Sequence, residues 1–203
     1  MGQANLYLIR HGETLWNAEE RLQGRLESHL STVGQEQVRS LLPHLSGIPI
    51  VRIYSSTMIR ACESAEILAQ VMNFSIYREE TLCEASFGAG EGMLKSDFHE
   101  KYADSLARYR TLPLEEKWHY QLAEGSETHG ETVARALPTL HRIAQSHIGE
   151  HVLVVTHGGV IRSILGHILR RDPRSIATPN AAFAHLKGDG QSFKIIKSHN
   201  IHI

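Results

Sequence analysis

The chain has 203 residues, with 21 Lys plus Arg against 22 Asp plus Glu, a length that suits one α/β domain over residues 1–203 and is short for two. This balanced charge offers no broad basic surface to nucleic acid or to a membrane, so any anion site must be local. No run approaches the ~20 apolar residues of a membrane span, and the start of the sequence lacks a signal-peptide pattern. The two cysteines have no metal or redox spacing. We therefore expect a cytoplasmic protein.

The first predicted strand ends in an Arg-His pair. Residues 6–9 read Leu-Tyr-Leu-Ile, a short apolar run that predicts a buried strand, and Arg10, His11 and Gly12 follow without a spacer. These side chains therefore lie at the carboxyl end of the strand, which is the edge where open α/β sheets bind ligands.

The next segments repeat this pattern of strand, helix and charged side chain. Ser31 is a predicted cap for a helix whose apolar spacing extends to residue 45, and Pro43 is expected to kink or end it. Residues 50–55 predict a second strand and residues 58–72 a second helix, so Arg60 follows a strand exit. The alternation of strands and helices predicts parallel pairing.

The middle of the chain is less regular. After a short predicted strand at residues 75–78, Glu84 is followed by a glycine-rich stretch and is therefore expected at the lip of a loop. Residues 95–124 predict a largely helical cover, because their aromatic residues have near-helical spacing that Pro113 interrupts.

A second histidine follows a strand in the last third of the chain. The β-branched run at residues 151–156 predicts a buried strand, and His157 and Gly158 come directly after it, as His11 and Gly12 do after the first. The other predicted elements are a helix over residues 133–144 that Pro138 should bend or shift, an apolar helix over 161–169, and a closing β-hairpin from 181–186 and 192–197.

The strand exits supply the groups that phosphate binding requires. Arginine binds two phosphate oxygens with its planar fork and stays charged at any working pH. Two guanidinium groups beside His11 would disfavour its protonation, which leaves one ring nitrogen free to attack phosphorus. We therefore predict a phosphate pocket with His11 as nucleophile and with donors from Arg10, Arg60, His157, Asn17, Gln23, Gly24 and the helix start at Gly158.

A phosphomonoester also needs a proton for its leaving group. Glu84 is the candidate general acid, because it lies in a glycine-rich lip rather than on a helix face. The alternative that Glu84 only caps or pairs stays open, and Glu13 and Glu91 are weaker candidates for the acid.

With these motifs in this order, the chain resembles the histidine phosphatase superfamily, the phosphoglycerate mutase-like group. The likeness includes Arg-His-Gly-Glu-Thr at residues 10–14 and runs from about residue 6 to the final hairpin. The resemblance implies a three-layer α/β/α sandwich with a mostly parallel sheet and helices on both faces. It also implies catalysis through a phosphohistidine without a metal or dissociable cofactor, with His11 phosphorylated, Glu84 as proton donor, and phosphate held by Arg10, Arg60, His157 and Asn17.

Some positions depart from the group's pattern and favour a phosphatase over a mutase. Ser28 and His29 stand where many members have Asp and Pro, and mutases tend to have Trp and Arg where this chain has Arg25 and Ala85. The chain is also shorter than typical mutases. It therefore looks like a phosphomonoesterase for a small phosphorylated metabolite, similar to the broad-specificity and α-ribazole-type members.

Several alternatives remain at this point. They are a phosphoglycerate mutase, a non-catalytic module that binds phosphorylated ligands, and a metallohydrolase with His11, His157 and Glu84 as ligands. The physiological substrate is not predicted, because the outer wall comes from the irregular 95–124 segment, and a homodimer is left open. A second acidic group on the substrate has four candidate partners, which are otherwise solvated surface: Arg21, Arg25, Arg108 and Arg110.

Overall fold

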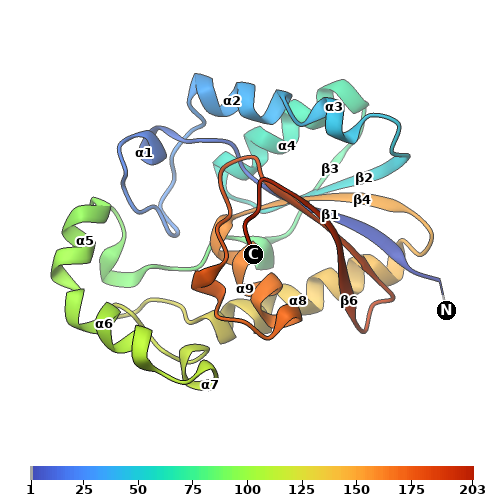
Figure 1. Ribbon diagram of the computed structural model, residues 1–203. Helices are drawn as coiled ribbons and strands as arrows, with labels where there is room; N and C mark the ends of the chain where they lie inside the picture. Colours follow the sequence, from blue (N-terminus) through green and yellow to red (C-terminus); the bar gives the residue numbers. More distant parts are fainter. Residues whose placement is uncertain (1) are drawn as a thin grey trace.

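A six-stranded mixed sheet runs through the centre of the molecule in the computed structural model, which describes residues 2–203 (Figure 1). The strand order is β3-β2-β4-β1-β5-β6. Strands β3, β2, β4 and β1 pair in parallel, whereas β5 pairs antiparallel with both of its neighbours, β1 and β6. This arrangement confirms the predicted α/β fold with a mostly parallel sheet. The strands are β1 (Ala4–Arg10), β2 (Ile50–Ser55), β3 (Ile76–Arg78), β4 (His151–Thr156), β5 (Phe183–Gly188) and β6 (Phe193–His199).

Helices cover both faces of the sheet, as predicted (Figure 1). The side chains of β1 alternate between the two layers: Leu6 and Leu8 pack into one hydrophobic cluster, and Tyr7 and Ile9 into the other. Burial on both faces explains why residues 6–9 of this strand are apolar without interruption. One layer holds α2 (Thr32–Arg39), α3 (Leu42–Leu45) and α4 (Ile59–Met72), and the other holds α8 (His129–Ser146) and α9 (Gly158–Leu169).

The two internal prolines behave differently. As predicted, the helix that Ser31 caps stops before Pro43: α2 ends at Arg39, and Pro43 lies in the first turn of α3, where its missing N–H is tolerated. Pro138 does not shift the start of its helix, because α8 begins at His129 and continues past it. The ring of Pro138 is on the exposed side of α8, where water can satisfy the carbonyl that loses its partner.

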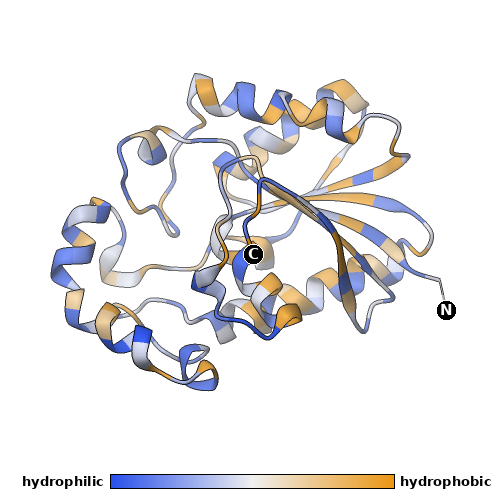
Figure 2. Ribbon diagram, in the orientation of Figure 1, coloured by the Kyte–Doolittle hydropathy of each residue, from blue (hydrophilic) through white to orange (hydrophobic). Residues whose placement is uncertain are grey.

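The remaining helices lie beyond the carboxyl end of β1, on the side of the molecule opposite the amino terminus (Figure 1). The helices of the 95–124 segment carry mostly hydrophilic residues and enclose a small apolar cluster around Phe98 and Leu106 (Figure 2). Within residues 2–203, none of the helices combines the length and the hydropathy that a bilayer crossing requires. These elements are α1 (Leu15–Ala18), α5 (Lys95–Lys101), α6 (Ala103–Thr111), α7 (Leu114–Lys117) and the 3₁₀ turns η1 (Glu80–Leu82), η2 (Gly88–Gly90) and η3 (Pro173–Ser175).

Candidate active site

The two histidines that follow β1 and β4 lie side by side. Arg10 is paired in register with Thr156, and the backbone N–H of His11 donates to the carbonyl of Thr156 over 3.0 Å. The two parallel strands therefore end together, and the ring centroids of His11 and His157 are 5.2 Å apart.

The backbone around His11 is held on several sides. The His11 carbonyl accepts from the side chain of Asn180 and from the N–H of Ala181, each over 3.2 Å. Gly12 donates its N–H to Ser64 Oγ on α4 over 3.1 Å, and a Cβ at Gly12 would lie 2.3 Å from the carbonyl oxygen of Gly34 on α2. Only glycine permits this close approach, so Gly12 lets the chain leave the sheet beside two helices.

The ring of His11 is buried, and its tautomer follows from one contact. Nδ1 lies 2.7 Å from the carbonyl of Gly12, which can only accept, so Nδ1 carries the hydrogen and Nε2 keeps its lone pair. Burial lowers the pKa of His11 well below its usual value, and the charges of Arg60 and Arg10 lower it further. The neutral imidazole predicted from the two guanidiniums is thus produced mainly by desolvation.

His157 uses the ring nitrogen Nε2 for a contact within the protein and leaves Nδ1 without a partner among residues 2–203. Its Nε2 lies 2.8 Å from Ser56 Oγ, which accepts from the backbone N–H of Met58 over 3.2 Å. Ser56 Oγ is also 3.3 Å from Cys83 Sγ, but an imidazole nitrogen is the better acceptor, so the hydroxyl hydrogen goes to Nε2. The remaining hydrogen of a neutral His157 is then on Nδ1, and burial followed by the charge of Arg60 keeps the pKa of this ring well below its usual value.

Four buried polar atoms around this place have no partner within residues 2–203: Arg10 Nε, Gln23 Oε1, Arg60 Nε and His157 Nδ1. Three of the four are hydrogen-bond donors on positively charged or neutral groups, and buried donors without partners are costly. The two arginines are held in place by other donors, since Arg60 donates to the carbonyls of Gly24 and Leu26 and Arg10 donates to that of Thr178. The unpaired donors therefore indicate a site where an anion can bind.

A cavity of about 290 Å³ lies among these groups. Burial, followed by the charge of Arg162, lowers the pKa of Arg10 to about 10, so this guanidinium is still protonated near neutral pH. We predicted nine residues for the site, and seven of them line this cavity: Arg10, His11, Asn17, Gln23, Gly24, Arg60 and Glu84. His157 joins them through its contact with the His11 ring, and Gly158 lies against the Arg10 side chain, with its notional Cβ 3.2 Å from Nε.

Glu84 is buried and held by two backbone groups. Its Oε1 accepts from the N–H of Ala85 over 2.9 Å, and its Oε2 accepts from the N–H of Gly159 in the first turn of α9 over 3.0 Å. The carboxylate therefore caps backbone donors and also lines the cavity, so capping does not remove it from the place where the predicted proton donor must lie.

Asn17 and Gly24 owe their positions to local structure. Thr14 and Asn17 form a capping box around α1, and Asn17 Oδ1 accepts from the N–H of Thr14 and from Asn180 Nδ2. The amide nitrogen of Asn17 is thus the end left for an anion. Gly24 adopts a φ of +56°, and the turn presents its carbonyl to Arg60.

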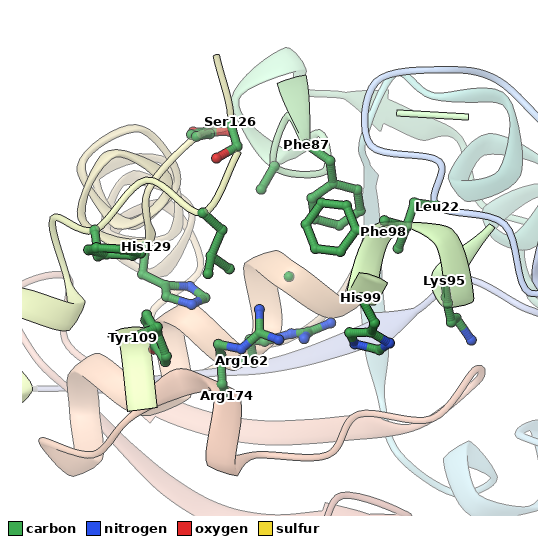
Figure 3. Close-up of a pocket in the computed structure, with 15 residues that line it drawn as sticks. Leu22, Phe87, Lys95, Phe98, His99, Tyr109, Ser126, His129, Arg162 and Arg174 are labelled. Carbon is green, nitrogen blue, oxygen red and sulfur yellow. The ribbon is translucent and has the colours of Figure 1, made fainter. Parts of the chain in front are cut away.

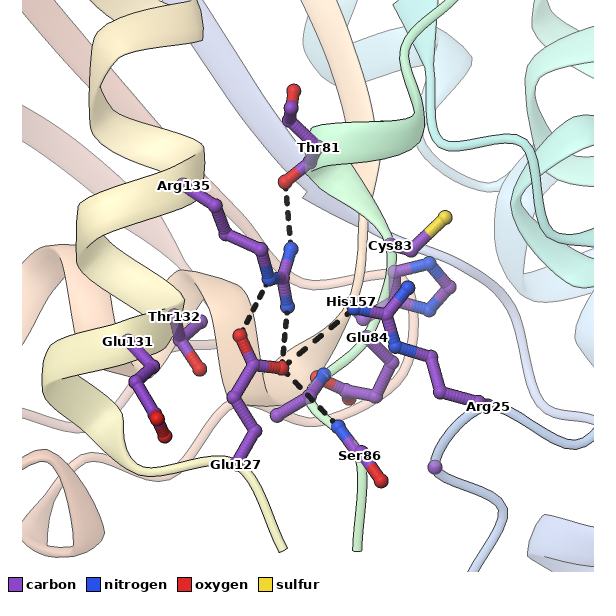
Figure 4. A network of polar contacts seen from close by, with 12 residues as sticks. Arg25, Thr81, Cys83, Glu84, Ser86, Glu127, Glu131, Thr132, Arg135 and His157 are labelled. Carbon is purple, nitrogen blue, oxygen red and sulfur yellow. Dashed lines mark hydrogen bonds and ion pairs between the residues drawn. The ribbon is translucent and has the colours of Figure 1, made fainter.

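An ion-pair network stands next to Glu84 (Figure 4). Glu127 binds Arg135 through both carboxylate oxygens, accepts from the N–H of Ser86 and pairs with Arg25 over 3.7 Å. Arg135 also donates to the carbonyl of Thr81 over 2.6 Å. The network ties the loop before α8 to both sides of Glu84, and it engages Arg25, which we had considered for a second substrate group.

Some lining residues were not predicted, among them Asn180 and Arg162. Arg162 could have been suspected, since it is the one charged residue within the apolar stretch of helix α9 that follows His157. Asn180 gives no comparable signal. Across the described residues, no group of three His, Cys, Asp or Glu side chains is arranged to hold a metal ion, so this geometry does not favour His11, His157 and Glu84 as joint metal ligands.

Comparisons with known proteins identify the family of the chain. The sequence profile of the histidine phosphatase superfamily, branch 1, matches residues 6–201. The chain is 31% identical to phosphoglycerate mutase-like protein 4 of Arabidopsis thaliana over 79% of its own length and 69% of that protein. It is 30% identical to phosphoserine phosphatase 1 of Hydrogenobacter thermophilus over 82% and 77% of the two chains.

A comparison with solved structures points to the same family. Bacillus stearothermophilus YhfR superposes with a TM-score of 0.83 over 95% of each chain, at 29% sequence identity. The fold, the matched profile and the predicted family agree, and the chain belongs to the histidine phosphatase superfamily.

Proposed function

We propose that the chain is a phosphomonoesterase that works through a phosphohistidine on His11. The observation that carries this proposal is the neutral His11 ring, which has its Nε2 lone pair available among cationic groups with unpaired donors. Family membership and a relative named phosphoserine phosphatase bear out the predicted phosphatase class.

In the first step, His11 Nε2 attacks phosphorus, and the bond from phosphorus to the ester oxygen breaks. Arg10, Arg60 and His157 Nδ1–H compensate the charge on the transferred phosphoryl oxygens. Glu84 gives its proton to the departing alkoxide, because its carboxyl lines the same cavity as His11. The alcohol leaves and phosphate remains covalently on His11.

In the second step, water attacks the phosphohistidine in line with the bond to Nε2. Glu84, now ionised, takes the proton from this water, and inorganic phosphate and neutral His11 are released. The same carboxyl thus serves as acid and then as base, and its two backbone hydrogen bonds keep it in place for both steps.

The direct test is phosphate release from a panel of small phosphorylated metabolites. We expect turnover by the wild type, less than a thousandth of it in His11→Ala, and inhibition by inorganic phosphate. His202→Ala serves as the matched control, because His202 is exposed and near the carboxyl terminus. Wild-type turnover that persists in His11→Ala would refute the proposal.

A mutase is the second candidate, because one relative is named phosphoglycerate mutase-like protein 4. An assay with 3-phosphoglycerate and a bisphosphate primer separates the two, and we expect phosphate release to outpace isomerisation. The cytoplasmic location and the homodimer stay predictions from the sequence.

A further inference from the structure

The cavity beside His11, where we propose that phosphate binds, is called the phosphate cavity below. A second cavity of about 240 Å³ adjoins it, under the helices of residues 95–124, called the cover helices. The two cavities share Leu22, Phe87, Lys95 and Arg162, so a substrate bound in the first can continue into the second. This volume is just below the range of about 300–1,000 Å³ usual for drug-sized ligands, so the space suits a small group.

The second cavity combines apolar walls with two arginines. Figure 3 shows the side chains of Arg162 and Arg174 next to each other on one side of the cavity, with the rings of Phe87 and Phe98 opposite them. Arg162 donates its Nε–H to the carbonyl of Gly158 over 3.1 Å, which leaves the outer guanidinium nitrogens to the cavity. Arg174 lies over the ring of Tyr109, with its Cζ 5.5 Å from the ring centroid.

No carboxylate within residues 2–203 comes within 4.0 Å of either guanidinium. The two acids nearby are engaged elsewhere: Asp172 binds Lys117 over 2.9 Å and accepts from the hydroxyl of Tyr109, and Glu127 binds Arg135. Arg174 is open to solvent on its outer side, and partial desolvation followed by the charge of Arg162 lowers its pKa, which fits two like charges placed close together. Adjacent unpaired cations are stabilised when an anion binds between them.

We propose that Arg162 and Arg174 bind a second anionic group of the substrate, carried on a short apolar stem that Phe87 and Phe98 contact. This inference rests on the proposed function, because the first anionic group is the phosphate held beside His11. The substrate class is a small phosphomonoester with a second acid, either a carboxylate or another phosphate. None of the four arginines considered from the sequence for this purpose lines the second cavity.

The test measures binding without turnover, by calorimetry. The probes are benzylphosphonate, 4-carboxybenzylphosphonate and a 1,4-bisphosphonate with the same stem, none of which can be hydrolysed. We expect the carboxylated probe to bind the wild type about 10- to 100-fold more tightly than benzylphosphonate, the gain expected for one or two charge-assisted hydrogen bonds. The bisphosphonate shows whether a phosphate is preferred to a carboxylate.

The decisive variant is Arg174→Gln, because Arg174 does not line the phosphate cavity. It should abolish the preference for the carboxylated probe, whereas Arg171→Gln should keep it, because Arg171 is an exposed arginine of the same connection, as Arg174 is, but lines neither cavity. Equal affinities of the wild type for both probes, or a preference that survives in a folded Arg174→Gln, would overturn the inference.

A phosphate-release assay in parallel separates this outcome from the proposed function. If the wild type hydrolyses phenyl phosphate but does not distinguish the probes, the phosphatase stands and the second site falls. If the probes are distinguished but nothing is hydrolysed, the second site stands and the phosphatase falls.

Discussion

Replacement of Gly159 by alanine should remove the proton donor while leaving the nucleophile intact. A Cβ at this position would lie 2.3 Å from Glu84 Oε1 and 3.1 Å from Glu84 Cδ, whereas ordinary contact begins near 3.4 Å. The carboxylate must therefore move by about 1 Å, and it loses the geometry of the bonds that it accepts from Ala85 and Gly159. His11 is not displaced, because its ring is fixed by Gly12 on the other strand exit.

The size of this effect depends on the leaving group. General acid catalysis contributes about 10²- to 10⁴-fold, and only a leaving group that is a strong base needs it. In Gly159→Ala we expect kcat/KM for an alkyl phosphate to fall about 100-fold more than kcat/KM for 4-nitrophenyl phosphate. That ratio corresponds to about 2.7 kcal/mol of transition-state stabilisation.

The assay compares both substrates in the wild type, Gly159→Ala and Glu84→Gln. The two variants should show the same dependence on the leaving group, because both act on one carboxyl. Alanine is a better helix former than glycine, so the melting temperature need not fall and can confirm that the variant is folded. An equal loss on both substrates, or no loss on the alkyl phosphate, would refute Glu84 as the proton donor.

Three further predictions concern the histidines. Ser56→Ala should lower kcat/KM about tenfold, because loss of the hydroxyl leaves the tautomer of His157 undefined. Ser56→Thr keeps a hydroxyl and should restore most of the lost kcat/KM. Wild-type kinetics in the alanine variant would contradict this role of Ser56. Nitrogen NMR should show His11 neutral and protonated on Nδ1 at pH 6.5, because its pKa is well below the usual value, and a doubly protonated ring at that pH would be inconsistent with the site. Burial, followed by the charge of Arg162, lowers the pKa of His129 to about 4 in the folded protein. As the pH falls, His129 is therefore protonated in the unfolded chain before it is protonated in the folded protein. The free energy of unfolding consequently drops between about pH 6.5 and 4. His129→Asn should reduce that slope by about 1.4 kcal/mol per pH unit in urea titrations, and an unchanged slope would argue against a buried neutral ring.

The phosphate cavity could be predicted because it depends on strand ends. Once residues 6–9 and 151–156 are identified as buried parallel strands, Arg10, His11 and His157 must meet at one edge of the sheet. A side chain directly after a strand is placed by the strand itself and does not depend on the conformation of a loop. The neutral state of His11 was predicted from neighbouring charges, although burial, which the sequence does not reveal, is the larger cause.

The outer part of the site was not predictable to the same extent. Arg174 comes from the connection after α9, and its position beside Arg162 depends on how α9, η3 and the cover helices pack. Arg25 and Arg108 looked equally suitable in the sequence, but Arg25 pairs with Glu127 and Arg108 lies over Tyr120. Long cationic side chains on loops find partners through tertiary contacts, and spacing along the chain carries no information about them.

The most direct measurement is to trap the covalent intermediate. The enzyme is mixed with a ³²P-labelled phosphomonoester, quenched in alkali within milliseconds and digested for mass spectrometry. The account predicts an acid-labile, alkali-stable phosphoryl group on the peptide that contains His11, and its absence in His11→Ala. Label on any other residue, or label that remains in His11→Ala at the wild-type level, would contradict it.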